Sequence, residues 1–123
     1  MWEEYNPNPC GRQVGDCAIR ALTKALNVSW EEAYDMVSDN GYQMCDMPSS
    51  NSVWGAVLRQ HGFHRLSIPA FYPDNYTAEN FCKDNPKGIY VLGFGTHVAT
   101  VINGNIYDSW DSRNEIPQYY WTK

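Results

Sequence analysis

Three side chains in this sequence, Cys17, His97 and Asp108, are of the types that catalyse reactions through a thiol nucleophile. A thiolate attacks a carbonyl carbon, an imidazole exchanges protons near neutral pH, and a carboxylate orients the imidazole and stabilises its protonated form. Each also has an ordinary structural role, since a buried thiol packs as a small apolar group and a histidine or an acid often binds only backbone or solvent. Catalysis therefore requires that the fold bring the three together.

Cys17 stands where a helix is expected to begin. Asp16 occupies the N-cap position, and Arg20, four residues further on, can form a modest ion pair with it. The apolar residues that follow recur with helical spacing and predict a helix over residues 17–26: Ala18, Ala21, Leu22 and Ala25. The unpaired N–H groups at a helix start favour a thiolate over a thiol. The helix position alone still favours a buried structural cysteine, so the case for an activated thiol at Cys17 depends on His97 and Asp108.

A tight hairpin is expected near the other two residues. Asn103-Gly104 separates two runs rich in β-branched residues and predicts a two-residue loop between strands over residues 96–102 and 105–110. Residues opposite each other in a hairpin share one face of the sheet, and side chains alternate between faces along a strand. This register puts Asp108 on the face of His97.

A second acid, Asp111, follows His97 in the same region. The two-residue loop points Asp111 to the opposite face of the sheet, whereas a three-residue loop would exchange the two acids. We therefore expect Asp108 to support His97, with Trp110 on the same face shielding their contact from water.

The order of the remaining elements separates helices from strands. A capping box at Ser29–Glu32 opens a second helix that Asn40-Gly41 closes. Further helices are expected over residues 53–61 and 77–84, strands over 63–68 and 88–94, and a C-terminal tail, Tyr119 to Trp121, that packs onto the domain. The sequence predicts an α+β fold, with N-terminal helices packed on a C-terminal antiparallel sheet in one domain over residues 1–123.

The composition bounds the class of protein. The chain has 123 residues, 43% of them hydrophobic, 15% aromatic, and a net charge of −5. Aromatic side chains supply a sizeable core, and the acidic balance disfavours a nucleic-acid or anionic-membrane surface. No apolar stretch is long enough to span a membrane, and the N-terminus does not resemble a secretory signal. We expect a cytoplasmic protein.

The cysteines and histidines do not form a metal-binding pattern. The four cysteines include no Cys-x-x-Cys pair, and His61 and His64 match no ligand spacing. Reduced thiols, no metal and no cofactor are therefore expected. The loop from Met44 to Met47 has two interpretations: its methionines cover the core or line a substrate groove.

Three segments resemble the papain-like cysteine peptidase superfamily, and most closely its small C39-like and phage-associated members. They read Gly15-Asp16-Cys17-Ala18-Ile19-Arg20-Ala21-Leu22, Gly95-Thr96-His97-Val98-Ala99 and Tyr107-Asp108-Ser109-Trp110, about a quarter of the chain. The resemblance implies a papain-like fold in which the nucleophile opens a helix packed on the sheet. It also implies that Cys17 is the nucleophile, His97 the general base and acid, and Asp108 the orienting residue.

One position departs from the family pattern. Papain-like enzymes usually carry an oxyanion-hole glutamine about six residues before the nucleophile, where this chain has Gly11. Gln13 and Asn8 are the candidates to replace it, with Asn6 as a further rival, and the backbone N–H of Cys17 supplies a donor in any case. Loss of one such side-chain donor costs about 2.7–4 kcal/mol of transition-state stabilisation.

These observations predict a thiol hydrolase that cleaves a peptide or amide bond in a peptide or protein substrate through an acyl-enzyme on Cys17. Two alternatives stay open. The same three residues serve a thiol acyltransferase, in which another acceptor replaces water. The missing glutamine and small size suit a non-catalytic binding or host-interaction module on the same scaffold.

Overall fold

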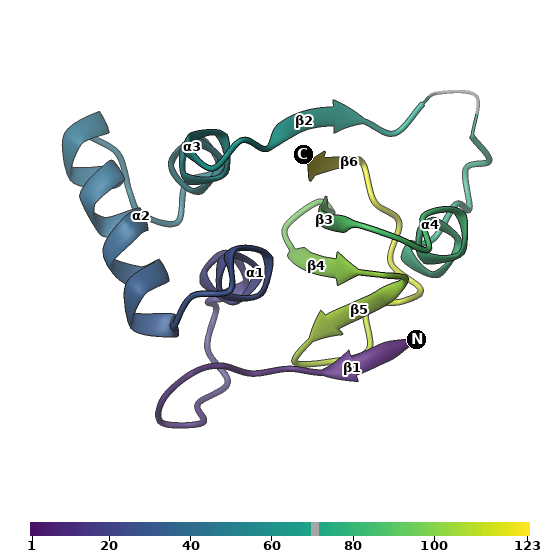
Figure 1. Ribbon diagram of the computed structural model, residues 1–123, viewed down its shortest axis with the longest axis horizontal. Helices are drawn as coiled ribbons and strands as arrows, with labels where there is room; N and C mark the ends of the chain where they lie inside the picture. Colours follow the sequence, from purple (N-terminus) through teal and green to yellow (C-terminus); the bar gives the residue numbers. More distant parts are fainter. Residues whose placement is uncertain (70–71) are drawn as a thin grey trace.

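A six-stranded sheet with helices on both faces forms the framework of the protein (Figure 1). The computed structural model describes residues 1–69 and 72–123. Along the chain the elements are β1 (Trp2–Glu4), α1 (Cys17–Leu26), α2 (Trp30–Met44), α3 (Asn51–Gln60), β2 (His64–Ser67), α4 (Ala78–Asp84), β3 (Ile89–Gly93), β4 (Val98–Ile102), β5 (Asn105–Asp108) and β6 (Tyr119–Thr122). The expected α+β class is confirmed.

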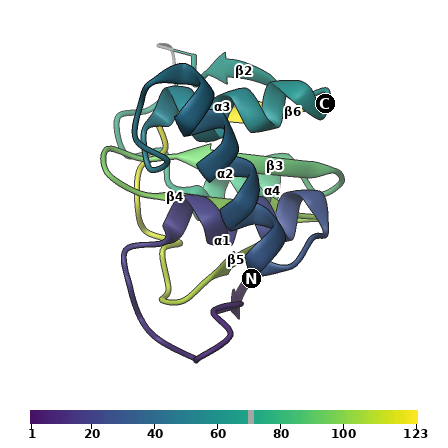
Figure 2. The ribbon, with the colours of Figure 1, turned by 90° about the vertical axis from the view of Figure 1, so that its left-hand side faces the viewer.

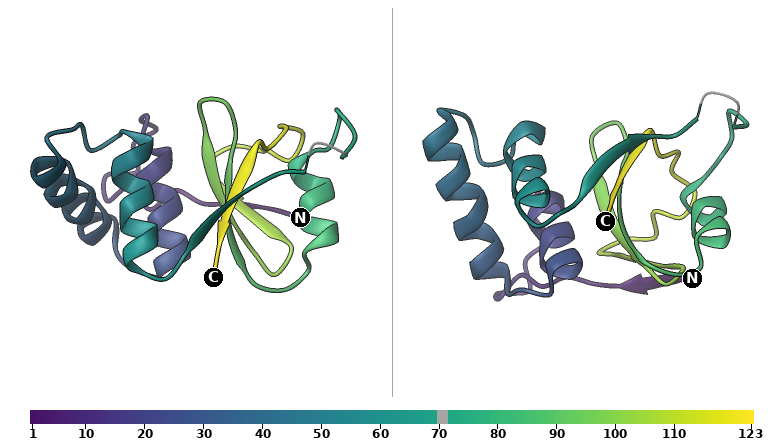
Figure 3. Two further views of the ribbon diagram at one scale, coloured as in Figure 1. Left: turned by 90° about the horizontal axis from the view of Figure 1, so that it is seen from above. Right: turned by 45° about the horizontal axis from the view of Figure 1, so that its top comes forward.

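The helices are divided unequally between the two faces of the sheet. Helices α1, α2 and α3 lie on one face and α4 covers the other, as Figure 3 shows from above. Figure 2 shows α1 to α3 from the outside of the helical layer. Each face has its own apolar core: Leu22, Trp54, Val57, Leu58 and Trp121 belong to the first, and Phe81, Leu92, Val101 and Ile106 to the second. The central strand β4 therefore contributes buried side chains to both cores.

The sheet is mixed, whereas the sequence predicted an antiparallel one. The strand order is β1-β5-β4-β3-β6-β2, and β1 pairs with β5 in parallel while the other described pairs are antiparallel. The sequence analysis missed β1 and β6, because strands of three and four residues are too short to show a clear alternating pattern. The C-terminal residues thus form an internal strand between β3 and β2 instead of a tail packed on the surface.

The hairpin between β4 and β5 has the register that the sequence predicted. Asn103 and Gly104 form its loop with φ values of 50° and 79°, the left-handed pair that a type I′ turn requires. The ladder runs from Ile102 opposite Asn105 to Thr100 opposite Tyr107. His97 and Asp108 lie just beyond its last pair, at the end of the sheet that faces the start of α1.

Helix α2 extends past the expected stop at Asn40-Gly41 and ends at Met44, where Cys45 adopts a left-handed conformation with φ 55°. Gly41 instead permits close packing, because a Cβ there would lie 2.9 Å from the carbonyl oxygen of Asp46. The capping box at its start is present as expected, with Glu32 N–H donating to Ser29 Oγ at 3.0 Å. The next helix, α3, begins at Asn51, two residues earlier than predicted.

Within the described ranges, no helix combines the length and the apolar character that a membrane span needs.

Candidate active site

Helix α1 presents Cys17 as its first residue, half-buried at the end of the sheet. Asp16 precedes it, but its side chain caps no N–H of the helix, contrary to the sequence-based interpretation. The Asp16 carboxylate instead accepts hydrogen bonds from Arg20 Nη1 at 2.8 Å and from Trp30 Nε1 at 2.9 Å. Asp16 and Arg20 are buried, and the contact with Trp30 is partly buried. Asp16 therefore ties the start of α1 to the start of α2.

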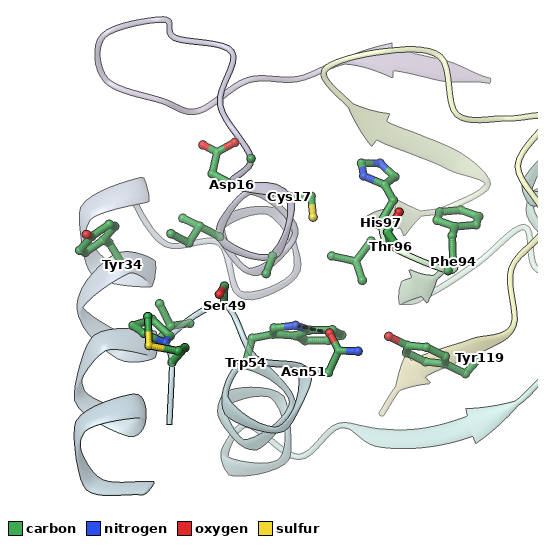
Figure 4. Close-up of a pocket in the computed structure, with 18 residues that line it drawn as sticks. Asp16, Cys17, Tyr34, Ser49, Asn51, Trp54, Phe94, Thr96, His97 and Tyr119 are labelled. Carbon is green, nitrogen blue, oxygen red and sulfur yellow. Dashed lines mark hydrogen bonds between the residues drawn. The ribbon is translucent and has the colours of Figure 1, made fainter. Parts of the chain in front are cut away.

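His97 approaches Cys17 from the loop that joins β3 to β4. The loop is closed by a backbone hydrogen bond from Phe94 N–H to the His97 carbonyl at 2.8 Å. The imidazole lies between two aromatic rings, with its centroid 5.8 Å from that of Phe94 and 5.0 Å from that of Trp110. Figure 4 shows Cys17 and His97 near one another in the upper part of the view, on neighbouring parts of the cavity wall.

Asp108 lies behind His97, fully buried at the end of β5. Its Oδ2 accepts from His97 Nε2 at 2.6 Å and from Ser112 Oγ at 2.7 Å, while Oδ1 accepts from Ser109 N–H at 2.8 Å and from Arg20 Nη2 at 3.2 Å. All four lone-pair positions of the carboxylate are thus used. Because Nε2 is held by Asp108, Nδ1 is the ring nitrogen left for Cys17.

The second acid, Asp111, is not part of this arrangement. Its carboxylate is exposed and binds the side chain of Arg113 at 2.8 and 2.9 Å. Of the two acids considered from the sequence, the structure brings only Asp108 to His97.

The sulfur of Cys17 has an environment that favours its ionised form. Burial raises the pKa of Cys17, but a hydrogen bond with His97, the backbone N–H of Val98 and the positive charges of His97 and Arg20 lower it below the ordinary value of a thiol. Opposite charge and hydrogen bonding thus outweigh desolvation. The geometry therefore supports a thiolate at Cys17.

The pKa of the His97 imidazole is shifted upward, opposite to the shift of Cys17. Burial opposes protonation of His97, yet its hydrogen bonds with Asp108 and Cys17 and the charges of both raise its pKa to about 9. Burial also raises the pKa of Asp108, but hydrogen bonds from His97 and Ser112 and the charges of His97 and Arg20 bring it below its usual value. The three pKa shifts accordingly favour a thiolate at Cys17, an imidazolium at His97 and a carboxylate at Asp108.

Arg20 is a component of the site that the sequence analysis undervalued. It was expected to form a modest surface pair with Asp16, but it is 5% exposed and joins Asp16 to Asp108. Its position three residues after Cys17 was the available signal, because side chains at i and i+3 lie on neighbouring parts of one helix face. Ser112 was also missed, and nothing in its surroundings in the sequence distinguishes it.

A cavity of about 410 Å³ opens beside the thiol, a volume within the range of small-ligand sites. Its walls come from the start of α1, the 94–98 loop, α2, the start of α3 and the loop before it, and they are mainly apolar: Ala18, Ile19, Val37, Met47, Pro48, Trp54, Phe94 and Val98. Met47 thus lines the groove, as one of the two interpretations of its loop proposed.

The Asn51 amide and the Tyr119 hydroxyl project into the cavity on the side away from Cys17 (Figure 4). Trp54 Nε1, which can only donate, gives its hydrogen to Asn51 Oδ1 at 3.1 Å and so turns the Asn51 NH₂ group away from itself. Tyr119 is held by close packing, since a Cβ on Gly93 would lie 2.0 Å from its ring. Burial raises the pKa of Tyr119, which keeps its hydroxyl as a donor.

Neither oxyanion-hole candidate from the sequence lies where that role needs it. Gln13 is exposed and Asn8 is half-buried, and both are absent from the cavity wall. Asn8 Oδ1 instead accepts from Cys10 N–H at 2.9 Å, and Asn6 Nδ2 donates to the Arg12 carbonyl at 3.1 Å, which folds the loop upon itself. The N–H of Cys17, at the first position of α1, is left as the donor beside the sulfur.

No metal-binding group emerges in residues 1–69 and 72–123, where three or more histidine, cysteine or acidic side chains never gather around one point. Comparison with known proteins gives no relative: no family model, curated protein or solved structure matches the chain.

Proposed function

We propose that this protein is a papain-like thiol hydrolase that cleaves a peptide or amide bond with Cys17, His97 and Asp108. The observation that carries the proposal is that the buried Asp108 holds His97 through a hydrogen bond of 2.6 Å while His97 and Cys17 line the same cavity. A buried structural histidine needs neither the thiol nor the cavity. The opposite pKa shifts of Cys17 and His97 are those that a nucleophile and its acid partner require.

In the first half-reaction the Cys17 thiolate attacks the carbonyl carbon of the scissile bond and forms a C–S bond. The oxygen takes up negative charge beside the N–H of Cys17 at the start of α1. His97, held as an imidazolium by Asp108, then gives its proton to the leaving nitrogen as the C–N bond breaks. The products are a free amine and a thioester on Cys17.

In the second half-reaction water replaces the amine. Neutral His97 removes a proton from the water as its oxygen attacks the thioester carbonyl. The C–S bond breaks, a carboxylic acid leaves, and the thiolate–imidazolium pair is restored. Asp108 keeps the His97 ring oriented through both steps. Its carboxylate binds His97 Nε2 at 2.6 Å in a partly buried contact, and the other side of the ring faces the cavity.

The proposal is tested by incubating the protein with a peptide library made by digesting a whole proteome and identifying new amino termini by mass spectrometry. Cleavage by the native protein that is absent from Cys17→Ala supports hydrolysis. Cys82→Ala is the matched control and should cleave as the native protein does, since Cys82 lies in the other core. A native protein that cleaves nothing and forms no thioester would favour the non-catalytic module, in keeping with the absence of Gln13 and Asn8 from the cavity wall.

A further inference from the structure

A second, smaller cavity lies next to the one beside Cys17, and the catalytic residues do not line it. This second cavity has a volume of about 180 Å³ and shares three wall residues with the first: Asn51, Trp54 and Tyr119. Its remaining wall includes two arginines, Arg59 from the last turn of α3 and Arg65 from β2. A substrate group that passes Asn51 and Tyr119 from the first cavity would reach these two positive charges.

Both guanidinium groups are held in place by aromatic rings. Arg59 lies 4.9 Å from the ring centre of Trp121, and Arg65 lies 4.1 Å from that of Tyr119. These rings belong to the internal strand β6 and are buried, so each arginine rests on a rigid support. Stacking restrains the planar group yet leaves its N–H donors free to point into the cavity.

No acid neutralises these charges. In the part of the chain that the structure describes, neither Arg59 nor Arg65 has a carboxylate within ion-pair distance, although the chain has a net charge of −5. Asp46 reaches the rim of the cavity through Ser52, but its carboxylate already accepts from Met47 N–H, Ser50 and Ser52. Two exposed arginines without an acidic partner give the second cavity a local positive potential in a protein that is acidic overall.

A further donor in the same wall has no acceptor. Trp121 is 2% exposed, and its Nε1 is the one buried side-chain nitrogen or oxygen in the described residues without a hydrogen-bond partner. An unpaired buried donor is unfavourable. In the described residues, the two arginines in the wall of the second cavity have no acidic partner, and an anionic oxygen would satisfy their N–H donors.

We propose that Arg59 and Arg65 form a carboxylate-binding subsite, so that the substrates are peptides carrying an acidic side chain or a free terminal carboxylate near the bond that Cys17 attacks. This inference rests on the proposed function. Guanidinium groups match the two oxygens of a carboxylate through paired N–H donors. On the path between the subsite and the thiol, Asn51 Nδ2 and the Tyr119 hydroxyl can donate to the peptide backbone.

The subsite is tested with thiol-reactive peptides that differ in one charge. Iodoacetyl tripeptide amides and tripeptidyl chloromethyl ketones extend from opposite sides of the reacting carbon, so together they scan both directions. Each set contains two glycines and one Glu, moved through the three positions, with Gln versions as neutral matches. All-glycine peptides with a free carboxylate or an amide end test the terminal carboxylate separately.

The expected result is that one acidic probe alkylates Cys17 about tenfold faster than its neutral match, a difference of about 1.4 kcal/mol. Arg59→Gln with Arg65→Gln should remove this preference, and the corresponding lysine variants should keep part of it. Arg12→Gln with Lys87→Gln, which also removes two positive charges but at exposed positions outside both cavities, should leave the preference intact.

The inference is overturned if every acidic and neutral pair reacts within about twofold, or if the preference survives in the double glutamine variant. Protection of Cys17 by millimolar inorganic phosphate without any preference for acidic probes would also overturn it, in favour of a phosphate site. If Cys17 reacts no faster than the exposed Cys10 and Cys45 with every probe, the proposed function fails instead. NMR titration of arginine Nε–H signals in Cys17→Ala with N-acetylglutamate amide and N-acetylglutamine amide then tests the subsite independently.

Discussion

Cys17 and Cys82 lie against opposite faces of one sheet, and burial acts on both thiols in the same direction. For Cys82, 4% exposed within α4, burial raises the pKa; the charge of the amino terminus opposes this rise and the charge of Glu79 adds to it. For Cys17, burial also raises the pKa, but His97, Val98 N–H and Arg20 reverse the outcome. Burial alone makes a thiol inert, and cationic partners make it a nucleophile.

The partners of Cys17 depend on contacts between distant parts of the chain. His97 comes from the loop before β4, Asp108 from the end of β5, and the cation of Arg20 is fixed between Asp108 and Asp16. Strand β1 adds support from the edge, because Tyr5 N–H and Trp2 Nε1 both donate to the Asp108 carbonyl, at 2.8 and 3.2 Å. Cys82 has no comparable framework of charges.

The largest effect on turnover is expected from His97→Ala. Without His97, burial would dominate at Cys17 as it does at Cys82. The change removes the proton donor for the leaving group and the main cation beside the sulfur, so peptide turnover should fall about 10²- to 10⁴-fold. Steady-state kinetics on a cleaved library peptide measure this. His61→Ala is the control, since His61 Nδ1 contacts only the Val57 carbonyl of its own helix and its loss should leave turnover unchanged.

The second prediction concerns the ion pairs behind the site. Arg20→Gln leaves the buried Asp16 and Asp108 without their shared cation, and we expect it to lower the free energy of unfolding by about 3–5 kcal/mol, as measured by urea denaturation. Arg113→Gln breaks the exposed pair with Asp111 and should leave the unfolding midpoint unchanged. Equal changes in the free energy of unfolding in the two variants would show that the buried ion pairs stabilise the fold no more than the exposed pair.

The third prediction separates the two acids. Because Asp108 raises the pKa of His97, its removal in Asp108→Ala lets the imidazolium lose its proton at lower pH. Turnover of the native protein should decline as pH rises through about 9, and in Asp108→Ala this decline should move toward 6.5, the ordinary histidine value. Turnover measured across a range of pH for the native protein and for Asp108→Ala gives the pH of decline in each.

Asp111→Ala should reproduce the native profile, because the Asp111 carboxylate contacts Arg113 and not His97. Asp108→Asn should lie between the native protein and Asp108→Ala, since an amide oxygen can still accept from Nε2 while the charge is lost. A larger change in Asp111→Ala than in Asp108→Ala would contradict the assignment.

The smallest effect is expected from Trp110→Ala. Trp110 covers one side of the His97 ring and is itself 43% exposed, so its loss admits water to the His97–Asp108 contact without removing a partner. Turnover should fall about two- to fivefold, equal to about 0.4–1 kcal/mol. Tyr42→Ala, at an exposed position of α2, controls for loss of a surface ring.

The parts of this arrangement that short-range patterns determine could be predicted from the sequence. The helical spacing after Cys17 gave α1 its observed bounds, and Asn103-Gly104 defined a hairpin whose register favoured Asp108 over Asp111. Both are local signals, set by side-chain periodicity and by backbone conformations with positive φ.

The parts that long-range contacts determine could not be predicted. Asp16 and Arg20 have the spacing of a surface pair, and only the meeting of α1 with β5 buries them. The strand β6 carries Tyr119 and Trp121 into two cavity walls, yet its four residues look like a packed tail until they pair with β3 and β2. Gln13 was a candidate because of its distance along the chain from Cys17, which says nothing about how the intervening loop folds.

The central claim, that His97 holds Cys17 as a thiolate, is tested most directly by alkylating the native protein with iodoacetamide across a range of pH and counting modification at each cysteine by mass spectrometry. Cys17 should react rapidly even at mildly acidic pH, well ahead of Cys82 and of the exposed Cys10 and Cys45, and His97→Ala should move its reaction to higher pH. If Cys17 follows the same pH curve as the other cysteines, or if His97→Ala leaves its curve unchanged, the claim is wrong.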